Sequence, residues 1–396
     1  MKICLVSQEY PPWSTGGIGT QTFLKAHGLA AAGHDVHVVT SSRESAEPTG
    51  DGEVTVHGVP HAGDSPFHDS SLQWIVHSQA VAARLLELGE HERFDVIEFA
   101  EYQAEGFAYE LETYGYRETP VVVMLHGSLA MFVERTGWPL PGTPLAHFGT
   151  FMEHTVVRRA DVLLAASKNI ADFWTARGGV EPNRVRLVRT AVNTAAFVPP
   201  AEAPAGGATV LFVGRIDGEK GVFAAVEAVA ALLPKHPDLR CRIVGRGSRE
   251  DEEALDRMIA ASPNPAAFEV LGHVGHERLP EVYAACDVFV APAPRDHGVA
   301  GVYLEAMACA RPVIASRAGG APEAVLDGAT GLLVPPDDRD ALAGALDRLL
   351  ADDELRDRMG GAGRERAVAE FSVERLVERC LAAYESAADA AVVGRR

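Results

Sequence analysis

Short apolar runs alternate with longer amphipathic stretches along the whole chain, and this alternation limits the folds that the sequence can adopt. Strands that are apolar on both faces are typical of parallel sheets with helices packed on both sides. We therefore predict an α/β fold with doubly wound parallel sheets. The predicted strands cover residues 2–6, 36–40, 94–99, 121–125, 162–167, 209–214, 241–245, 268–272, 288–292, 312–316 and 331–335.

A segment rich in Pro, Ala and Gly, residues 199–207, separates these strands into two sets. The chain has 396 residues, which is long for a single hydrophobic core. We interpret the segment as an interdomain linker. It would join an N-terminal Rossmann-like domain (1–198) to a C-terminal Rossmann-like domain (208–370). A final helix, 371–391, is expected to pack back on the N-terminal domain.

Charge and composition exclude some classes of partner and compartment. The formal net charge of −19 argues against a protein that binds a nucleic-acid backbone. The five cysteines form no C-x-x-C pair and lie in apolar runs, which indicates core thiols in a reducing compartment. The opening apolar run is too short for a signal peptide, and no segment approaches the ~18 apolar residues of a membrane helix. We expect a cytoplasmic protein without a strong membrane signal.

In open parallel sheets, ligands bind at the carboxyl ends of the strands. After the first predicted strand, Gly16 and Gly17 open a helix, where backbone N–H groups can meet a phosphate or a sugar. The spacing is not G-x-G-x-x-G, and the second strand ends at Thr40-Ser41-Ser42 instead of at an acidic residue. This disfavours an NAD-dependent oxidoreductase. A purely structural glycine turn is the alternative interpretation.

Three ionisable side chains follow other strands directly. His126 comes after the strand at 121–125, and Gly127 beside it clears space for a ligand. A structural histidine is the alternative. Gly214, Arg215 and Lys220 lie in FVGRIDGEKG, between a strand and a helix. Arg offers a fork of donors and Lys a compact charge, a combination that suits a diphosphate. A solvated turn is the alternative for this pair.

The stretch RDHGVAGVYLEA, residues 295–306, is a second glycine-rich crossing from a strand to a helix. Gly298 and Gly301 allow close approach of a ligand, and Glu305 can accept hydrogen bonds from the vicinal hydroxyls of a ribose. After the next strand, the loop at 317–325 adds Gly319, Gly320 and Glu323. We predict that this loop also reaches phosphate or sugar.

Together these motifs resemble the retaining glycosyltransferases of family 4, which have the GT-B fold. The resemblance covers nearly the whole chain. It rests on GGIG, LHG, VGRIDGEKG, YLEAMACARPVIAS with GGAPEAV, and the late FSVERL. It implies two Rossmann-like domains with an interdomain cleft, in which a nucleotide-diphosphate sugar binds as co-substrate without a cofactor or a metal.

The resemblance also implies roles for single residues. Arg215 and Lys220 would neutralise the diphosphate leaving group and stabilise its charge in the transition state. Glu305 would hold the ribose, and His126 would contact the donor sugar. Transfer on one face of the sugar, with the leaving phosphate assisting deprotonation of the acceptor, needs no carboxylate nucleophile. The predicted donor-binding residues are Gly16, Gly17, Gly214, Asp296, His297, Gly298, Val299, Ala300, Gly301 and Glu305.

The crossing at 295–306 departs from the family pattern. The family usually carries a glutamate eight residues before Glu305, as the first member of an E-x7-E pair, and His297 stands at that position. Either Asp296 supplies the missing carboxylate or His297 contacts the sugar; we favour His297 because Gly298 keeps its expected place. A third interpretation is that the change reduces or abolishes transfer.

The acceptor and the donor sugar are the least constrained by the sequence. Glu98 and Glu101, at a strand end, and Trp138 are candidates for acceptor binding, with a solvated helix face and core packing as alternatives. The D-x-D at 338–340 fits a helix cap better than a metal site. We expect transfer from a UDP-hexose to a hydroxyl of a small molecule or glycan. The alternatives are a nucleotide-sugar hydrolase, an impaired nucleotide-sugar-binding protein and, disfavoured, the oxidoreductase.

Overall fold

The computed structural model describes residues 1–12, 16–42, 49–61, 70–177, 179–201 and 207–393. The chain forms two compact units: Met1–Thr190 with Val373–Arg396 is unit 1, and Ala191–Ser372 is unit 2. The division falls before the predicted boundary at 198 because residues just after it pair within unit 2. The Val192 N–H donates to the Phe371 carbonyl, and Arg364 donates to the carbonyls of Thr194 and Phe197. Within the predicted linker, residues 202–206 lie outside the described residues.

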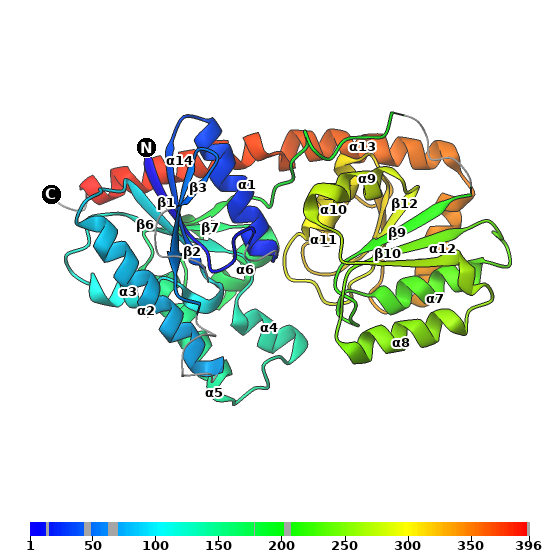
Figure 1. Cartoon of the computed structure of the whole chain (residues 1–396), viewed down its shortest axis with the longest axis horizontal. Coiled ribbons are helices and arrows are strands. Elements are labelled where there is room, and N and C mark those ends of the chain that lie inside the picture. The colour runs from blue at the N-terminus through cyan, green and yellow to red at the C-terminus, as the bar shows by residue number, and fades with distance from the viewer. Residues whose placement is uncertain (13–15, 43–48, 62–69, 178, 202–206, 394–396) are drawn as a thin grey trace. The chain divides into compact units, whose positions relative to one another are not determined.

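Unit 1 is built on an eight-stranded sheet in the order β3-β4-β2-β1-β5-β6-β7-β8 (Figure 1). All neighbouring strands are parallel except β3, which runs antiparallel to β4. The strands are β1 Lys2–Val6, β2 Asp35–Ser41, β3 Thr49–Asp51, β4 Val54–Val59, β5 Val96–Ala100, β6 Val121–Leu125, β7 Val162–Ala165 and β8 Val185–Leu187.

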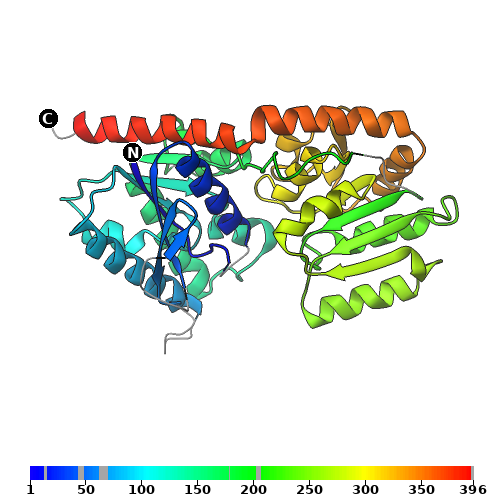
Figure 2. The ribbon, with the colours of Figure 1, turned by 45° about the horizontal axis from the view of Figure 1, so that its top comes forward.

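Helices cover both faces of this sheet. α1 packs beside α14 on one face, and α2, α3 and α5 pack together on the other (Figure 1). Figure 2 shows α14 extending along unit 1 toward the C-terminus. The helices are α1 Gly17–Ala31, α2 Ser70–Gly89, α3 Phe107–Glu112, α4 Leu129–Thr136, α5 Pro144–Arg159, α6 Lys168–Ala176 and α14 Val373–Val393.

Unit 2 contains a six-stranded, fully parallel sheet in the order β11-β10-β9-β12-β13-β14. One buried cluster fills the space toward α9, α10 and α13, and a second lies toward α7, α8 and α12. The strands are β9 Thr209–Val213, β10 Arg240–Val244, β11 Phe268–Gly272, β12 Val288–Ala291, β13 Val313–Ser316 and β14 Gly331–Val334. The helices are α7 Val222–Leu232, α8 Arg249–Ala260, α9 Leu279–Ala284, α10 Gly301–Ala308, α11 Ala321–Ala324, α12 Arg339–Leu350 and α13 Asp353–Phe371.

The predicted doubly wound α/β class is confirmed, and each predicted strand is present within one or two residues. Sequence analysis missed β3, β4 and β8. β3 and β8 are short strands at the two edges of the unit 1 sheet, and their partly exposed residues produce no continuous apolar run.

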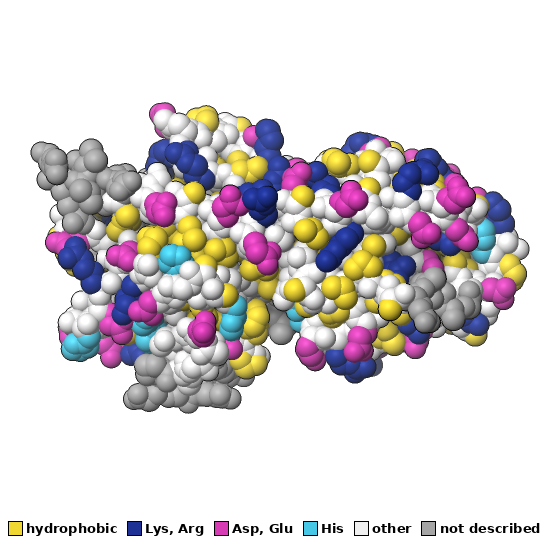
Figure 3. Space-filling view, turned by 90° about the horizontal axis from the view of Figure 1, so that it is seen from above, with side chains coloured by type: hydrophobic (Ala, Val, Ile, Leu, Met, Phe, Trp, Pro, Cys, Tyr) yellow, Lys and Arg dark blue, Asp and Glu magenta, His cyan; other side chains and the backbone are white. Residues whose placement is uncertain are grey.

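Other predictions concern single side chains. All five cysteines are buried and free, as expected of core thiols. Asp338 caps α12 by accepting the Ala341 N–H at 2.9 Å, which confirms the helix-cap interpretation of the D-x-D. On the face shown in Figure 3, acidic and basic side chains are interspersed. Within the described residues, no helix is both long and apolar enough to cross a membrane.

Candidate active site

The turn that follows β9 is fixed against the ends of two neighbouring strands. The Gly214 N–H donates to the Val244 carbonyl at 3.0 Å, and the Ile216 N–H donates to the Arg246 carbonyl at 2.9 Å. Gly221 has φ +81°, and a β-carbon there would lie 2.5 Å from the Pro292 carbonyl oxygen. Only glycine avoids both the strain and the clash. The backbone between Gly214 and Gly221 therefore has a defined place at the carboxyl edge of the sheet.

Within this turn, Asp217 orients the two predicted cations. Its carboxylate accepts the Lys220 backbone N–H at 2.8 Å and lies 3.1 Å from the Arg215 Nε. The Arg215 side chain remains 70% exposed, so its guanidinium is open to a ligand. Sequence analysis assigned no role to Asp217, although an Asp whose carboxylate accepts a backbone N–H a few residues later is common in turns.

Lys220 lies close to Asp296, which belongs to the second glycine-rich crossing (295–306). The Lys220 Nζ lies 4.0 Å from Asp296 Oδ1, and the same oxygen accepts the His297 backbone N–H at 3.0 Å. The buried Tyr303 hydroxyl donates to Asp296 Oδ2 at 3.2 Å. Asp296 is thus held from several sides next to Lys220, while the His297 side chain is half-buried beside it.

The loop after β13 packs directly on this crossing. A β-carbon at Gly319 would lie 2.2 Å from the Asp296 carbonyl oxygen, and one at Gly320 would lie 2.3 Å from the Gly298 carbonyl carbon. The two predicted loops therefore touch through backbone. The Val299 side chain is buried in the core, which leaves its backbone as the part available to a ligand.

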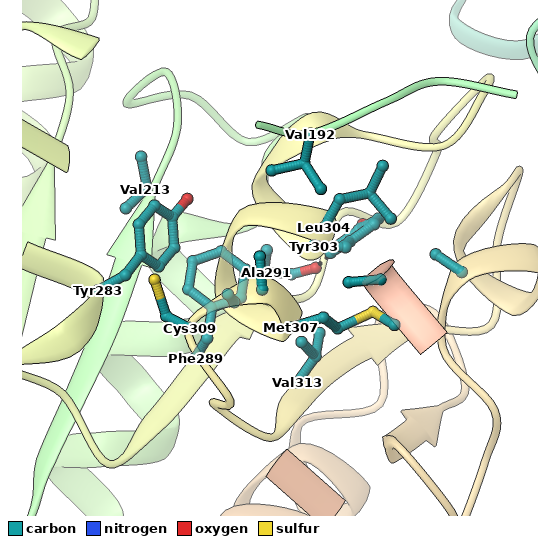
Figure 4. Packing of buried hydrophobic residues seen from close by; sticks show 14 of the residues in the cluster. Val192, Val213, Tyr283, Phe289, Ala291, Tyr303, Leu304, Met307, Cys309 and Val313 are labelled. Atoms are coloured by element: carbon teal, nitrogen blue, oxygen red, sulfur yellow. Dashed lines mark hydrogen bonds between the residues drawn. The ribbon is translucent and has the colours of Figure 1, made fainter. Parts of the chain in front are cut away.

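Glu305 lies in α10, which begins at Gly301 with Ala300 as its N-cap residue. Its buried carboxylate accepts the Tyr283 hydroxyl at 2.8 Å and lies 3.3 Å from the His276 Nε2. The hydrogen bond to Glu305 is the main cause that raises the pKa of His276, against the opposing effect of burial. Figure 4 shows Tyr283 among the buried apolar residues of unit 2.

This arrangement leaves Glu305 with capacity for a ligand. A carboxylate has about four lone-pair positions, and Tyr283 and His276 use two of them. The remainder suit two vicinal hydroxyl groups, as on a ribose. Sequence analysis missed the supporting role of Tyr283 and His276, because neither stands at a spacing from Glu305 that a local motif would reveal.

In unit 1, the GGIG loop differs from the expectation in one respect. The Glu9 carboxylate already lies at the start of α1, where its Oε2 is 3.5 Å from the Gly19 N–H. A β-carbon at Gly16 would lie 1.8 Å from Glu9 Oε2, so Gly16 makes room for Glu9. Among the described residues, nothing lies within 4 Å of the corresponding position at Gly17. Gly17 therefore keeps the open approach that was predicted for both glycines.

His126 follows β6 and is half-buried. Burial and, to a smaller extent, the nearby Lys25 charge lower its pKa to about 3. The imidazole is therefore neutral at physiological pH, with one nitrogen as donor and the other as acceptor. Such a group can hydrogen-bond sugar hydroxyls without adding charge.

The structure places the side chains of Glu98 and Glu101, two predicted acceptor-binding residues, inside unit 1. The buried Glu98 carboxylate pairs with the Lys25 ammonium group, and it accepts the Tyr384 hydroxyl of α14 at 2.7 Å. Glu101 is fully buried and accepts backbone N–H groups. Glu98 lies in β5 and Glu101 directly follows it, and both side chains are buried in unit 1. Trp138, in contrast, is 52% exposed, and its ring lies 6.3 Å from that of Phe132.

Comparisons with known proteins agree with this geometry. The family model described as "Glycosyltransferase Family 4" matches residues 15–196, and that described as "Glycosyl transferases group 1" matches residues 196–366. The chain is 28% identical to the glycogen synthase of Mycobacterium tuberculosis, over 98% of this chain and 95% of that protein. It is 37% identical to the D-inositol 3-phosphate glycosyltransferase of Acidothermus cellulolyticus, over 59% of this chain and 56% of that protein.

Solved structures with a similar fold include two that align over nearly the whole chain. Sucrose-phosphate synthase from Thermosynechococcus elongatus has a TM-score of 0.83 at 24% identity, covering 98% of this chain and 100% of that one. Anabaena HepE in complex with UDP and glucose has a TM-score of 0.75 at 19% identity, with the same coverage. At these identities the likeness concerns the fold, and it confirms the predicted GT-B class.

Proposed function

We propose, since the chain belongs to the family 4 glycosyltransferases, that it moves a hexose from a UDP-sugar to a hydroxyl of a small-molecule or glycan acceptor, with retention and without a metal. The observation that carries the proposal is the polar edge of unit 2. There, Lys220 and Asp296 lie 4.0 Å apart, and Glu305 is held by Tyr283. UDP is favoured because HepE, a neighbour in fold, was solved with UDP and with UDP-glucose.

In the proposed reaction, the bond between the anomeric carbon and the β-phosphate oxygen breaks, and the acceptor oxygen bonds to that carbon on the same face. The acceptor proton passes to the leaving phosphate, and UDP departs. Arg215 and Lys220 stabilise the charge that develops on the diphosphate. Glu305 binds the ribose hydroxyls, and the neutral His126 contacts the donor sugar. No side chain forms a covalent intermediate.

The first test is a calorimetric titration with UDP, GDP and ADP, each compared with its sugar conjugates. We expect UDP to bind and one UDP-hexose to bind more tightly. Transfer is then assayed with acceptors taken from the relatives, namely glycogen and D-inositol 3-phosphate. The anomeric configuration of the product tests retention, and activity in the presence of a chelator tests metal independence. Binding of none of the nucleotides would contradict the proposal, and sugar release without acceptor would favour the hydrolase.

A variant tests the role of Lys220. Lys220→Ala is expected to lower kcat by about 10²–10³-fold, the usual cost of removing one group that stabilises transition-state charge. Its ion pair with Asp296 is long and the side chain is 37% exposed, so the free energy of unfolding should change by less than ~1 kcal/mol. Lys235→Ala is the matched control, because Lys235 pairs with Asp347 at 2.7 Å outside the site. Equal losses of kcat and stability in Lys220→Ala would contradict the role.

A further inference from the structure

The loop that carries His126 is held by a carboxylate from the neighbouring strand. Glu101 Oε2 accepts the His126 backbone N–H at 2.6 Å, and Oε1 accepts the Gly127 N–H at 2.6 Å. Oε2 also accepts the Tyr102 N–H at 3.1 Å. Both carboxyl oxygens of the buried Glu101 therefore accept hydrogen bonds from backbone N–H groups. Two of these donors belong to His126 and Gly127.

A second buried carboxylate holds the next residues of the same loop. Glu153, from α5, places both oxygens 2.9 Å from the Leu129 N–H at the start of α4. Ser128 caps α4 by accepting the Met131 N–H at 3.2 Å. The chain from His126 to Met131 is thus fixed by Glu101, which follows β5, and by Glu153 of α5, as well as by its own cap.

Burying two interacting carboxyl groups, Glu101 and Glu153, costs desolvation free energy. Burial raises the pKa of Glu101 to about 7 and that of Glu153 well above its ordinary value, and the Glu101 charge adds to the second shift. A carboxylate is nevertheless the side chain that accepts on both oxygens; a carboxamide presents an N–H2 group to one of the donors. Three backbone N–H groups donate to the two carboxyl oxygens of Glu101, and this arrangement favours an acidic residue over glutamine.

We propose that Glu101 and Glu153 are positioning residues that form a clamp on the His126 loop and set the place of the His126 imidazole. The proposal deepens the function proposed above and rests on it for the role of His126. Neither carboxylate touches the substrate: Glu101 acts through the backbone of His126, and Glu153 acts through the following turn. Their substitution should therefore alter catalysis only to the extent that His126 takes part in it.

One test does not depend on activity. The His126 ring signals are assigned by NMR through their loss in His126→Asn, and the imidazole is titrated. In the wild type it should stay neutral between about pH 5 and pH 8. In Glu101→Gln the loosened loop should admit water, and the pKa of His126 should rise toward its ordinary value of about 6.5. Glu110→Gln is the matched control, because Glu110 is an equally buried carboxylate that lies near Arg117 and Arg159 instead of His126.

The second test separates kcat from KM. Displacement of a catalytic group by about 1 Å costs roughly 10²-fold in rate, so Glu101→Gln should lower kcat by up to this factor while the KM for the donor changes little. In the His126→Ala background the same substitution should cause no further loss. Glu110→Gln should keep the wild-type kcat even though it lowers the melting temperature.

The clamp is refuted if Glu101→Gln folds and leaves both the His126 titration and kcat as they are in Glu110→Gln. An additional loss of kcat in the His126→Ala background would also refute it. Should Glu101→Gln fail to fold, Glu153→Gln decides by the same two readouts. A wild-type enzyme that transfers no sugar would contradict the proposed function, while the imidazole titration would still test the clamp.

Discussion

Replacing Tyr283 by Phe is the sharpest perturbation of the proposed ribose site. The change removes only the hydroxyl that donates to Glu305 at 2.8 Å, inside a fully buried environment. A hydrogen bond to a charged group contributes about 1.5–3 kcal/mol. We expect the free energy of unfolding to fall by about this amount, because Glu305 stays buried and, of the two polar partners described above, keeps only His276.

The same loss should appear in nucleotide affinity. Without Tyr283 the Glu305 carboxylate is no longer held in one orientation, and binding must restore that order. If about half of the lost interaction energy appears as lost binding energy, the Kd for UDP rises roughly three- to tenfold, since 1.4 kcal/mol corresponds to a factor of ten. UDP and its sugar conjugate should weaken by equal factors, because the ribose is common to both.

Tyr303→Phe is the matched control. It makes the same chemical change at an equally buried tyrosine, but the lost donor serves Asp296 at 3.2 Å. We expect calorimetry to show a smaller effect on UDP than on the additional affinity that the sugar provides. The reasoning is wrong if Tyr283→Phe loses stability and binds UDP as the wild type does, or if the two variants weaken UDP equally.

Three further predictions concern other charged or polar groups. His297→Ala should reduce discrimination between donor sugars more than affinity for bare UDP; a loss of UDP affinity alone would contradict this. The pKa of His276 is raised in the folded state, so its stabilising contribution is complete below its ordinary pKa of about 6.5 and disappears as pH rises through the raised value. Urea unfolding should therefore show a larger stability difference between the wild type and His276→Gln at about pH 6 than at about pH 8, and a larger difference at the higher pH would reverse the sign. Lys25→Met leaves the buried Glu98 charge without its cation and should cost about 3–5 kcal/mol in denaturant unfolding, and adding Glu98→Leu should recover most of this loss.

The parallel sheets were predictable because their central strands are buried on both faces. In β6, for example, every residue is buried, and the sequence VVVML carries that information by itself. Edge strands lack this signal. In β8, Arg186 and Leu187 are exposed, and the short strand is defined by its pairing with β7. Such pairing is a tertiary contact that a local pattern does not contain.

The carboxylates of unit 1 show a different limit. Glu98 lies in VIEFA, a strand whose five residues are all buried, and a charge inside such a strand implies a buried partner. This signal was available in the sequence and favours a structural role over acceptor binding. Its partners were not predictable, because Lys25 and Tyr384 are 73 and 286 residues away along the chain.

The two units differ in how they use buried polar groups, and the difference agrees with the proposed chemistry. In unit 2, hydroxyl groups of buried tyrosines donate to Asp296 and Glu305, and each carboxyl group keeps further lone pairs for a ligand. In unit 1, the carboxyl oxygens of Glu101 accept backbone N–H groups of the His126 loop. The polar side chain that this loop carries is the neutral imidazole of His126. In the proposed function, the cations Arg215 and Lys220 suit a diphosphate, the carboxyl group of Glu305 suits the ribose hydroxyls, and a neutral group suits an uncharged hexose. In the reaction that we propose, a cationic His126 would oppose the positive charge that develops at the anomeric carbon as its bond to the leaving phosphate breaks. The lowered pKa of His126, which keeps its imidazole neutral at physiological pH, therefore agrees with the contact to an uncharged sugar that we propose.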